Sequence, residues 1–164
     1  INSRRTWLAY YNLHRQYHNP LHNDDIIYTP VVRVIKDDDY NVLDNPFDIS
    51  VITCAAPNLR KKPSNKYNLG DGEKVEISKE DLLKLHEQRA RQIINVASIY
   101  RPYALIVGAF GCGAFQNPPE IVAHAWKNVL ASINLPINVV EFAIYCPSED
   151  KINYNVFKQV LLDE

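Results

Sequence analysis

The sequence is 164 residues long, 46% hydrophobic and 23% charged, with a formal net charge of −1. These values exclude a disordered or collagen-like chain, and the near-neutral charge favours neither nucleic acid nor anionic lipid as a partner. No apolar stretch of the sequence reaches the roughly 18 residues needed to cross a bilayer. We therefore expect one globular domain over residues 1–164, with no DNA, RNA or membrane partner.

The start of the chain and its cysteines bear on its origin and location. The sequence contains no methionine and begins with Ile1, so we expect the C-terminal majority of a longer protein, with the N-terminal part missing. The three cysteines, Cys54, Cys112 and Cys146, are odd in number and widely spaced, which does not suit a disulfide framework. They predict reduced thiols and a cytoplasmic or nuclear location.

Helical and strand-like patterns of apolar residues divide the chain into elements. In chain order they predict a helix over 3–17, then a strand over 31–35 that residues 26–28 lead into, and a second strand over 47–54. A helix starting at Ser78 and ending at about Tyr100 follows, then a strand over 103–107, a helix over 118–133, a strand over 137–145 and a helix over 151–162. The residues Lys36–Asn41 form a charged turn, and the run 47–54 is apolar enough to be buried on both faces. Ser78, with Asp81 three residues later, resembles a capping box at a helix start.

The order of these elements predicts the fold class. Apolar strands separated by helices long enough for crossovers imply an α/β fold, in which a mostly parallel sheet is covered on both faces. Function in such sheets is expected in loops at the C-terminal ends of the strands. The long polar loop over residues 57–76 is also of a kind that is usually functional or mobile.

The most informative segment follows the strand predicted before residue 108. Three glycines lie within six residues there, Gly108, Gly111 and Gly113. We expect Asn117 to cap the following helix, with Pro118 at its first position and Glu120 at its third. A strand, a glycine loop and a helix start together favour anion binding, because backbone N–H groups and the helix dipole point at the ligand.

The glycine spacing departs from known nucleotide-binding fingerprints. The order G-x-x-G-x-G reverses the dinucleotide pattern, and a P-loop needs Gly-Lys-Ser/Thr, whereas no lysine occurs in this region before Lys127. Phe110 and Phe115 interrupt the glycines. Either they pack on the ribose or base of a bound nucleotide, or they are core phenylalanines of a tight turn, and the residues alone leave both interpretations open.

Four segments of the chain resemble one known family. The longest is G-A-F-G-C-G-A-F-Q-N-P-P-E-I-V-A at residues 108–123. The others are S-R-R-T at 3–6, Y-T-P followed by V-I-K-D-D within 28–38, and V-I-T-C-A-A-P-N at 51–58. Together they resemble the microbial-type poly(ADP-ribose) glycohydrolases, a branch of the macrodomain superfamily, and the first segment resembles the diphosphate-binding loop of that family.

This resemblance implies a three-layer α/β/α macrodomain-like fold with a mostly parallel mixed sheet that binds ADP-ribose at its C-terminal edge. It implies that a single loop wraps the diphosphate, formed by Gly108, Ala109, Phe110, Gly111, Cys112, Gly113, Ala114 and Phe115. Phe115 would lie against a ribose, Thr53 and the turn that ends at Asn58 would form the neighbouring rim, and Tyr145 with Cys146 would line the adenosine side. No cofactor or metal is implied, and the expected partners are ADP-ribose, poly(ADP-ribose) and ADP-ribosylated proteins.

The chemistry that the resemblance implies is hydrolysis of a ribose glycosidic bond, in which a glutamate protonates the leaving oxygen and then activates water. In the family this glutamate lies in a Gly-Gly-Gly…Gln-Glu-Glu segment before the helix that Ile1 begins here, and neither motif occurs in these 164 residues. We therefore expect an ADP-ribose-binding domain of poly(ADP-ribose) glycohydrolase type, which hydrolyses these bonds only when the upstream segment is present. The alternative is a non-catalytic module that binds ADP-ribose or another nucleotide.

Three further sets of residues suggest other chemistry. His14, His18 and His22 have the spacing of metal ligands on one helix, but a proline between the last two breaks that helix, so we expect solvated or capping roles. Cys112 at the helix start would suit a thiol enzyme only beside a basic partner, and buried inert thiols are favoured. The basic run Arg60–Lys62 is a solvated surface unless a polyanion lies beside it.

Overall fold

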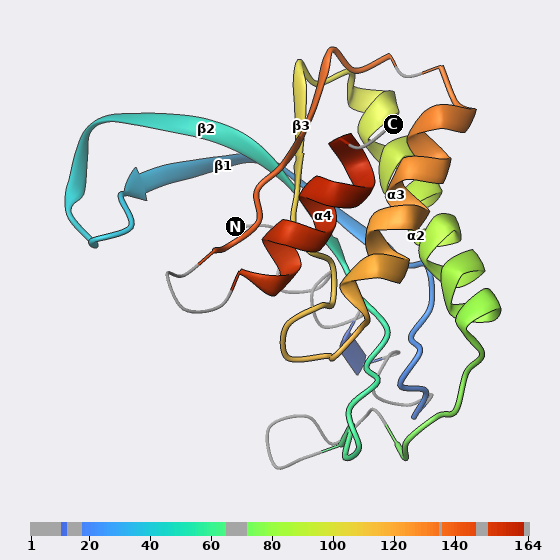
Figure 1. Cartoon of the computed structure of the whole chain (residues 1–164). Helices are drawn as coiled ribbons and strands as arrows, with labels where there is room; N and C mark the ends of the chain where they lie inside the picture. Colours follow the sequence, from blue (N-terminus) through green and yellow to red (C-terminus); the bar gives the residue numbers. More distant parts are fainter. Residues whose placement is uncertain (1–10, 13–17, 65–71, 135, 147–150, 163–164) are drawn as a thin grey trace.

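The structure, a computed structural model, describes residues 11–12, 18–64, 72–134, 136–146 and 151–162 (Figure 1). Its elements are β1 (Ile26–Lys36), β2 (Val42–Cys54), α2 (Lys79–Tyr100), β3 (Ala104–Val107), α3 (Pro119–Ser132), β4 (Val139–Phe142) and α4 (Ile152–Leu162). Each strand and helix predicted after residue 20 is found, with its ends shifted by a few residues. Residues 11–12 are helical, and the rest of the helix predicted over 3–17 lies outside the described residues.

β1 and β2 form an antiparallel hairpin, at whose base Ile26 pairs with Cys54. The turn between them is the one that the charged residues predict. The Asp37 carboxylate accepts the backbone N–H groups of Asp39 and Asn41 at 3.0 and 2.8 Å. A connection this short cannot hold a crossover, so the two strands have to be antiparallel.

The tip of this hairpin projects away from the helices (Figure 1). The strand predicted over 47–54 is longer than expected, and the expectation that it is buried on both faces is wrong, because Phe47 is 53% and Ile49 42% exposed. In the part of the chain that is described, only the base of β2, with Ile52 and Cys54, packs against the core. The outer part of the strand has no layer of structure over it.

β3 and β4 are parallel, with Ala104 opposite Val139 and Val107 opposite Phe142, and α3 forms the crossover between them. The α/β class is confirmed, and both parallel and antiparallel pairs occur. Within the described residues, however, the strands form two separate two-stranded sheets and not one mostly parallel sheet. This arrangement leaves one edge of β2 and one edge of β3 facing away from their partners.

The helices follow local rules, and α2 shows them most clearly. Ser78 Oγ accepts the N–H of Asp81 at 3.0 Å and donates to the Asp81 carboxylate at 2.8 Å, which confirms the predicted capping. After Tyr100 the backbone of Arg101 turns left-handed, with a φ of 46°, and Pro102 follows, so the helix ends. None of the helices in the described segments is both long and apolar enough to span a membrane.

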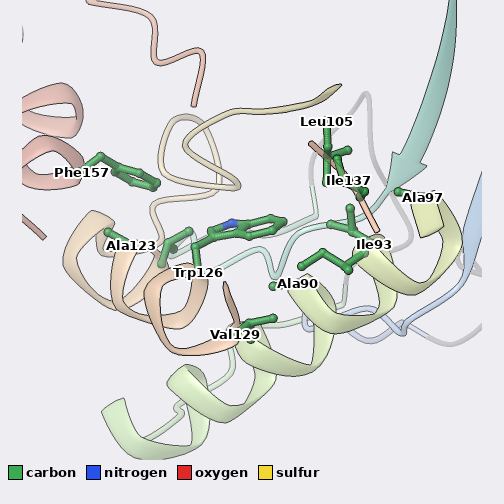
Figure 2. Packing of buried hydrophobic residues seen from close by; sticks show 11 residues of the cluster. Ala90, Ile93, Ala97, Leu105, Ala123, Trp126, Val129, Ile137 and Phe157 are labelled. Atoms are coloured by element: carbon green, nitrogen blue, oxygen red, sulfur yellow. The ribbon is translucent and has the colours of Figure 1, made fainter. Parts of the chain in front are cut away.

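The hydrophobic core lies where α2, α3 and α4 pack against the sheet of β3 and β4. Figure 2 shows Trp126 of α3 in the middle of this core, with Phe157 of α4 on one side and Ile93 of α2 on the other. The indole of Trp126 meets Phe142 of β4 edge-on, with ring centroids 5.8 Å apart. This packing fixes α3 against β4, and thereby fixes the glycine loop that leads into α3.

Candidate ligand-binding site

The loop between β3 and α3, residues 108–118, is a series of tight turns. Backbone hydrogen bonds of 3.0 Å close them, from Cys112 to Ala109, from Gln116 to Gly113 and from Asn117 to Gly111. Gly111 has to be glycine, because its φ is +76° and a Cβ there would lie 2.5 Å from Asn117 Nδ2 and 2.8 Å from Ala56 Cβ. At Gly113, by contrast, a Cβ would meet nothing within 4 Å. The inner turn is therefore packed and the outer turn is open.

The buried side chain of Asn117 ties this loop to the end of β2. Its Nδ2 donates to the carbonyl of Pro57 at 2.7 Å and to the carbonyl of Gly111 at 3.0 Å. Its Oδ1 accepts a hydrogen bond from Nε2 of His86 at 2.9 Å. Both amide hydrogens and the amide oxygen are thus used inside the protein, as a side chain that is only 2% exposed requires.

The start of α3 differs from the prediction as a consequence. Pro118, and not Asn117, occupies the cap position, and it makes no side-chain capping bond. α3 begins at Pro119, so Glu120 is its second residue and not its third. The predicted roles of these residues are wrong because the Asn117 oxygen, through which a capping side chain would accept a backbone N–H, already accepts from His86.

His86 of α2 is a buried, neutral member of this network. Both hydrogens of the Asn117 amide go to carbonyls, so the amide oxygen is the atom that faces the imidazole of His86. Because this oxygen can only accept, Nε2 of His86 carries the hydrogen of the bond between them. The ring meets Phe110 edge-on, with centroids 6.2 Å apart. Burial lowers the pKa of His86, the hydrogen bond to Asn117 opposes this, and the positive charge of Arg89 adds to the lowering.

Arg89, also on α2, holds the turn after β2 from another side. Its guanidinium is 1% exposed, donates to the carbonyls of Ala55 and Leu21, and pairs with the carboxylate of Asp24. Sequence reasoning missed this residue. The sequence does contain a signal for its burial, which is helical spacing. Arg89 falls four residues before the buried Ile93 and so lies on the face of α2 that enters the core. An arginine on that face needs buried partners.

Asn58, which the sequence placed at the rim of the site, is fully buried behind it. Its backbone N–H donates to the carbonyl of Pro20 at 2.7 Å, and its Nδ2 donates to the carbonyl of Pro63 at 3.3 Å. Its Oδ1 accepts from Nε of Arg60 at 3.1 Å. The structure therefore shows Asn58 shaping the turn on which the rim is built.

Phe115, a residue of the glycine loop, lies half-buried at the rim, against the turn after β2. The guanidinium carbon of Arg60 lies 5.6 Å from the centroid of its ring, and the imidazole of His22 lies 6.0 Å away, centroid to centroid. The N–H of Leu59 donates to the Phe115 carbonyl at 2.9 Å. Phe110, in contrast, packs against the core. Of the two phenylalanines in the loop, Phe110 is therefore a core residue and Phe115 lies at the rim.

The outer turn of the loop presents backbone hydrogen-bond donors. Gly113 and Ala114 are exposed, and in the described parts of the chain no protein acceptor takes the N–H groups of Gly113, Ala114 or Phe115. The uncapped start of α3 follows a few residues later. Consecutive free N–H groups next to a helix start form a concave site for an anion.

Two other predicted site residues come from β2 and from the segment after β4. Thr53, at the end of β2, lines a cavity of about 850 Å³ between β2 and β3, together with Gly108 and Phe110. Tyr145 follows β4 and is 87% exposed. Its contact with the adenosine part of a ligand stays a prediction.

The cysteines and histidines bear on the other chemistry that the sequence suggested. Burial raises the pKa of Cys112 to about 12, and it also raises the pKa of Cys54, so neither side chain forms a reactive thiolate readily near neutral pH. This argues against a thiol enzyme. Over the described residues, no three His, Cys, Asp or Glu side chains are grouped to hold a metal ion, while His14 lies outside those residues.

Comparisons with known proteins place this geometry among solved structures. No protein-family model matches the chain, and a search of curated proteins finds no significant match. The poly(ADP-ribose) glycohydrolase of Deinococcus radiodurans, in complex with ADP-ribose, matches 94% of this chain with a TM-score of 0.79 and 29% sequence identity. The poly(ADP-ribose) glycohydrolase of Thermomonospora curvata, bound to the inhibitor ADP-HPD, matches 94% of the chain with a TM-score of 0.76 and 27% identity.

The match extends over less of those proteins than of this one. The chain spans 59% of the Deinococcus radiodurans chain and 56% of the Thermomonospora curvata chain. The resemblance seen in the sequence is confirmed at the level of the fold. Over the length that it covers, this chain has the α/β, macrodomain-like fold of the microbial poly(ADP-ribose) glycohydrolases.

Proposed function

We propose that this chain binds ADP-ribose, with the diphosphate over the backbone N–H groups of Gly113, Ala114 and Phe115. These exposed donors, in a loop held by the side chain of Asn117, are the observation that carries the proposal. They suit a diphosphate because backbone N–H groups beside a helix start attract anionic oxygens without a lysine. The ADP-ribose bound to the Deinococcus radiodurans protein of similar fold supports the same class of ligand.

The rim supplies further contacts in this proposal. The ring of Phe115 lies beside the donors and would pack against the ribose next to the diphosphate. The guanidinium of Arg60, held over this ring at 5.6 Å, adds positive charge to the same side of the loop. Thr53 and Tyr145 are proposed to contact other parts of the ligand.

Hydrolysis is the activity that we propose for the domain when its acid is present. Cleavage of the ribose glycosidic bonds of poly(ADP-ribose), or of ADP-ribosylated proteins, requires a carboxylic acid near the leaving oxygen. The family resemblance puts that acid in a Gln-Glu-Glu segment, which does not occur in these 164 residues. We therefore expect the 164-residue chain to bind ADP-ribose without cleaving polymer, and release of ADP-ribose from polymer by the purified chain would contradict this. A module that binds ADP-ribose without cleaving it is the second candidate.

The binding proposal is tested by two substitutions at one open position. Gly113→Glu adds a carboxylate beside the backbone N–H donors of residues 113–115, whereas Gly113→Ala adds only a methyl group. Both side chains fit, because nothing lies within 4 Å of a Cβ at this position. In calorimetry with ADP-ribose we expect at least about tenfold weaker binding for Gly113→Glu, and affinity within about threefold of wild type for Gly113→Ala. Equal affinity of wild type and Gly113→Glu would remove this loop from the site.

A further inference from the structure

The guanidinium of Arg60 is held in place by neutral oxygen atoms. Its Nε donates to Oδ1 of Asn58 at 3.1 Å, and its Nη2 donates to the carbonyl of Pro63 at 3.0 Å. Within the described residues no carboxylate pairs with it, whereas Arg33 and Arg89 each form an ion pair with an aspartate. The positive charge of Arg60 is therefore fixed in position but is not neutralised.

The two acceptors of Arg60 are themselves fixed by hydrogen bonds. Asn58 is fully buried, and its Nδ2 donates to the same carbonyl of Pro63 at 3.3 Å. Its Oδ1 also accepts the backbone N–H of Arg60 at 3.3 Å. The turn over residues 58–63 thus orients the guanidinium before a ligand arrives, so a ligand that binds there loses little affinity to the ordering of a long side chain.

These acceptors occupy only one edge of the guanidinium. Nε and one hydrogen of Nη2 form that edge, which leaves both hydrogens of Nη1 and the second hydrogen of Nη2 without an acceptor among the described residues. One N–H of Nη1 and one of Nη2 are parallel on the second edge, and such a fork binds two oxygens of a phosphate or a carboxylate. Because Arg60 is only half-buried, a ligand can reach it from solvent.

Arg60 lies beside the proposed ADP-ribose site, on the side of β2. Its guanidinium carbon is 5.6 Å from the ring centroid of Phe115, and the N–H of Leu59 bonds to the carbonyl of Phe115. Residues of β2 and β3 line the cavity between these strands, whereas β4 pairs with β3 and does not line it. Arg60 after β2 and Tyr145 after β4 therefore lie on opposite sides of the glycine loop. With the adenosine on the Tyr145 side, the terminal ribose of ADP-ribose lies on the Arg60 side.

The free edge of Arg60 suits an anion other than the diphosphate. The diphosphate has donors of its own in the backbone N–H groups of residues 113–115, so a group next to the terminal ribose is the one within reach of Arg60. Lys61 and Lys62 are exposed beside it, and no carboxylate among the described residues pairs with either. This excess of positive charge favours a phosphate, which carries up to two negative charges, over a carboxylate.

We propose that Arg60 binds a second phosphate of the ligand, carried by a group on the terminal ribose of ADP-ribose. The free edge of its guanidinium donates to two oxygens of this phosphate while the diphosphate stays on the glycine loop. Two sources supply such a phosphate: an ester on the terminal ribose itself, and the diphosphate of a second ADP-ribose unit joined to that ribose. The inference rests on the proposed binding of ADP-ribose and deepens it, because it makes Arg60 the residue that selects ligands extended by a phosphate.

Calorimetry with three ligands on the wild-type chain tests this. The ligands are ADP-ribose, ADP-ribose with a phosphate ester at the anomeric hydroxyl of its terminal ribose, and the dimer in which that anomeric carbon is joined to the adenosine ribose of a second unit. We expect at least one of the two extended ligands to bind at least about tenfold more tightly than ADP-ribose. The ligand that shows this gain identifies the source of the phosphate. Equal affinity for all three ligands would overturn the proposal.

Three variants assign the gain to the guanidinium of Arg60. The quantity compared is the ratio of the affinities for the extended ligand and for ADP-ribose in each variant, so a general disturbance of the site cancels. We expect Arg60→Met to reduce the gain to less than about twofold and Arg60→Lys to restore less than about half of it, since an ammonium lacks the planar fork. The matched control Lys61→Met should keep the gain within about twofold of wild type. A full gain in Arg60→Met or in Arg60→Lys would contradict the proposal.

The outcomes separate this inference from the proposed function. If ADP-ribose binds and is weakened by Gly113→Glu, but a second phosphate adds no affinity, the role given to Arg60 is wrong and the binding proposal stands. If the wild-type chain does not bind ADP-ribose at all, the binding proposal is wrong and the inference about Arg60 falls with it.

Discussion

Nε2 of His86 donates a hydrogen bond to Oδ1 of Asn117 at 2.9 Å, although 31 positions separate the two residues in the sequence. The bond joins α2 to the glycine loop, and the same asparagine joins the loop to the turn after β2 through Pro57. The conformation of the backbone N–H donors at residues 113–115 therefore depends on a buried polar network as well as on the glycines of the loop.

Removing the asparagine side chain should destabilise the protein strongly. Asn117→Ala leaves the His86 N–H and the carbonyls of Pro57 and Gly111 without their buried partner, so we expect the free energy of unfolding to fall by about 2–3 kcal/mol. The matched control is Asn128→Ala, which removes an exposed bond of 2.7 Å to Glu87 and should cost less than about 1 kcal/mol. Urea unfolding of the two variants measures both. Similar losses in both would show that the Asn117 network contributes no special stability.

The stability of the fold should depend on pH through His86. Burial holds the pKa of His86 in the folded chain below its ordinary value of 6.5, so the unfolded chain takes up this proton at a higher pH than the folded chain does. The contribution of the neutral, buried His86 to the free energy of unfolding is therefore fully present above about pH 6.5. It is lost progressively as the pH falls toward the pKa of His86 in the folded chain. Urea midpoints measured at about pH 7.5 and about pH 5.5 test this, with His86→Gln as a variant that keeps an amide donor but does not titrate. An equally large pH effect in His86→Gln would assign it to other groups.

Arg89 should contribute far more stability than an exposed arginine in a similar ion pair. Arg89→Met leaves the Asp24 carboxylate and the Ala55 carbonyl without their buried donor, and we expect a loss of about 3 kcal/mol. The comparison is Arg33→Met, which breaks an ion pair with Asp48 on the exposed hairpin, with contacts of 2.6 and 2.8 Å, and should cost far less stability because water replaces the lost contacts. Thermal or urea unfolding provides the measurement, and equal losses would contradict the role given to Arg89.

If ADP-ribose binds as proposed, Arg60 should strengthen binding through its charge beside Phe115. Arg60→Met removes the positive charge but keeps much of the apolar stem over the ring, so we expect roughly fivefold weaker binding of ADP-ribose and a weaker dependence of affinity on salt. Lys61→Met removes the same charge from the adjacent, exposed residue and should change affinity less than about twofold. Calorimetry at two salt concentrations distinguishes them. The same loss in both variants would mean that the basic loop acts only through its general charge.

Local features of the fold could be predicted from the sequence because their partners are close along the chain. The turn at Asp37, the cap formed by Ser78 and Asp81, and the end of α2 before Pro102 all depend on contacts within a few residues. The glycine loop after an apolar strand was also visible, since its turns are closed by bonds across a few residues. The resemblance of this loop to one family then predicted the fold that the solved structures share.

The roles of several side chains could be found only in the folded chain. Asn117 bonds to a carbonyl 60 positions away, and Arg89 to one 34 positions away, so the local sequence predicts a helix cap for the first and no special role for the second. The exposure of the outer part of β2 and the open edges of β2 and β3 depend on which layers pack over them, and that is decided by tertiary contacts. The sequence by itself determined the order of the elements and the position of the anion-binding loop, through short-range turn and helix rules. Only the tertiary structure decided which polar groups are buried and which strand edges are open, because burial and strand pairing join residues that are distant in the chain.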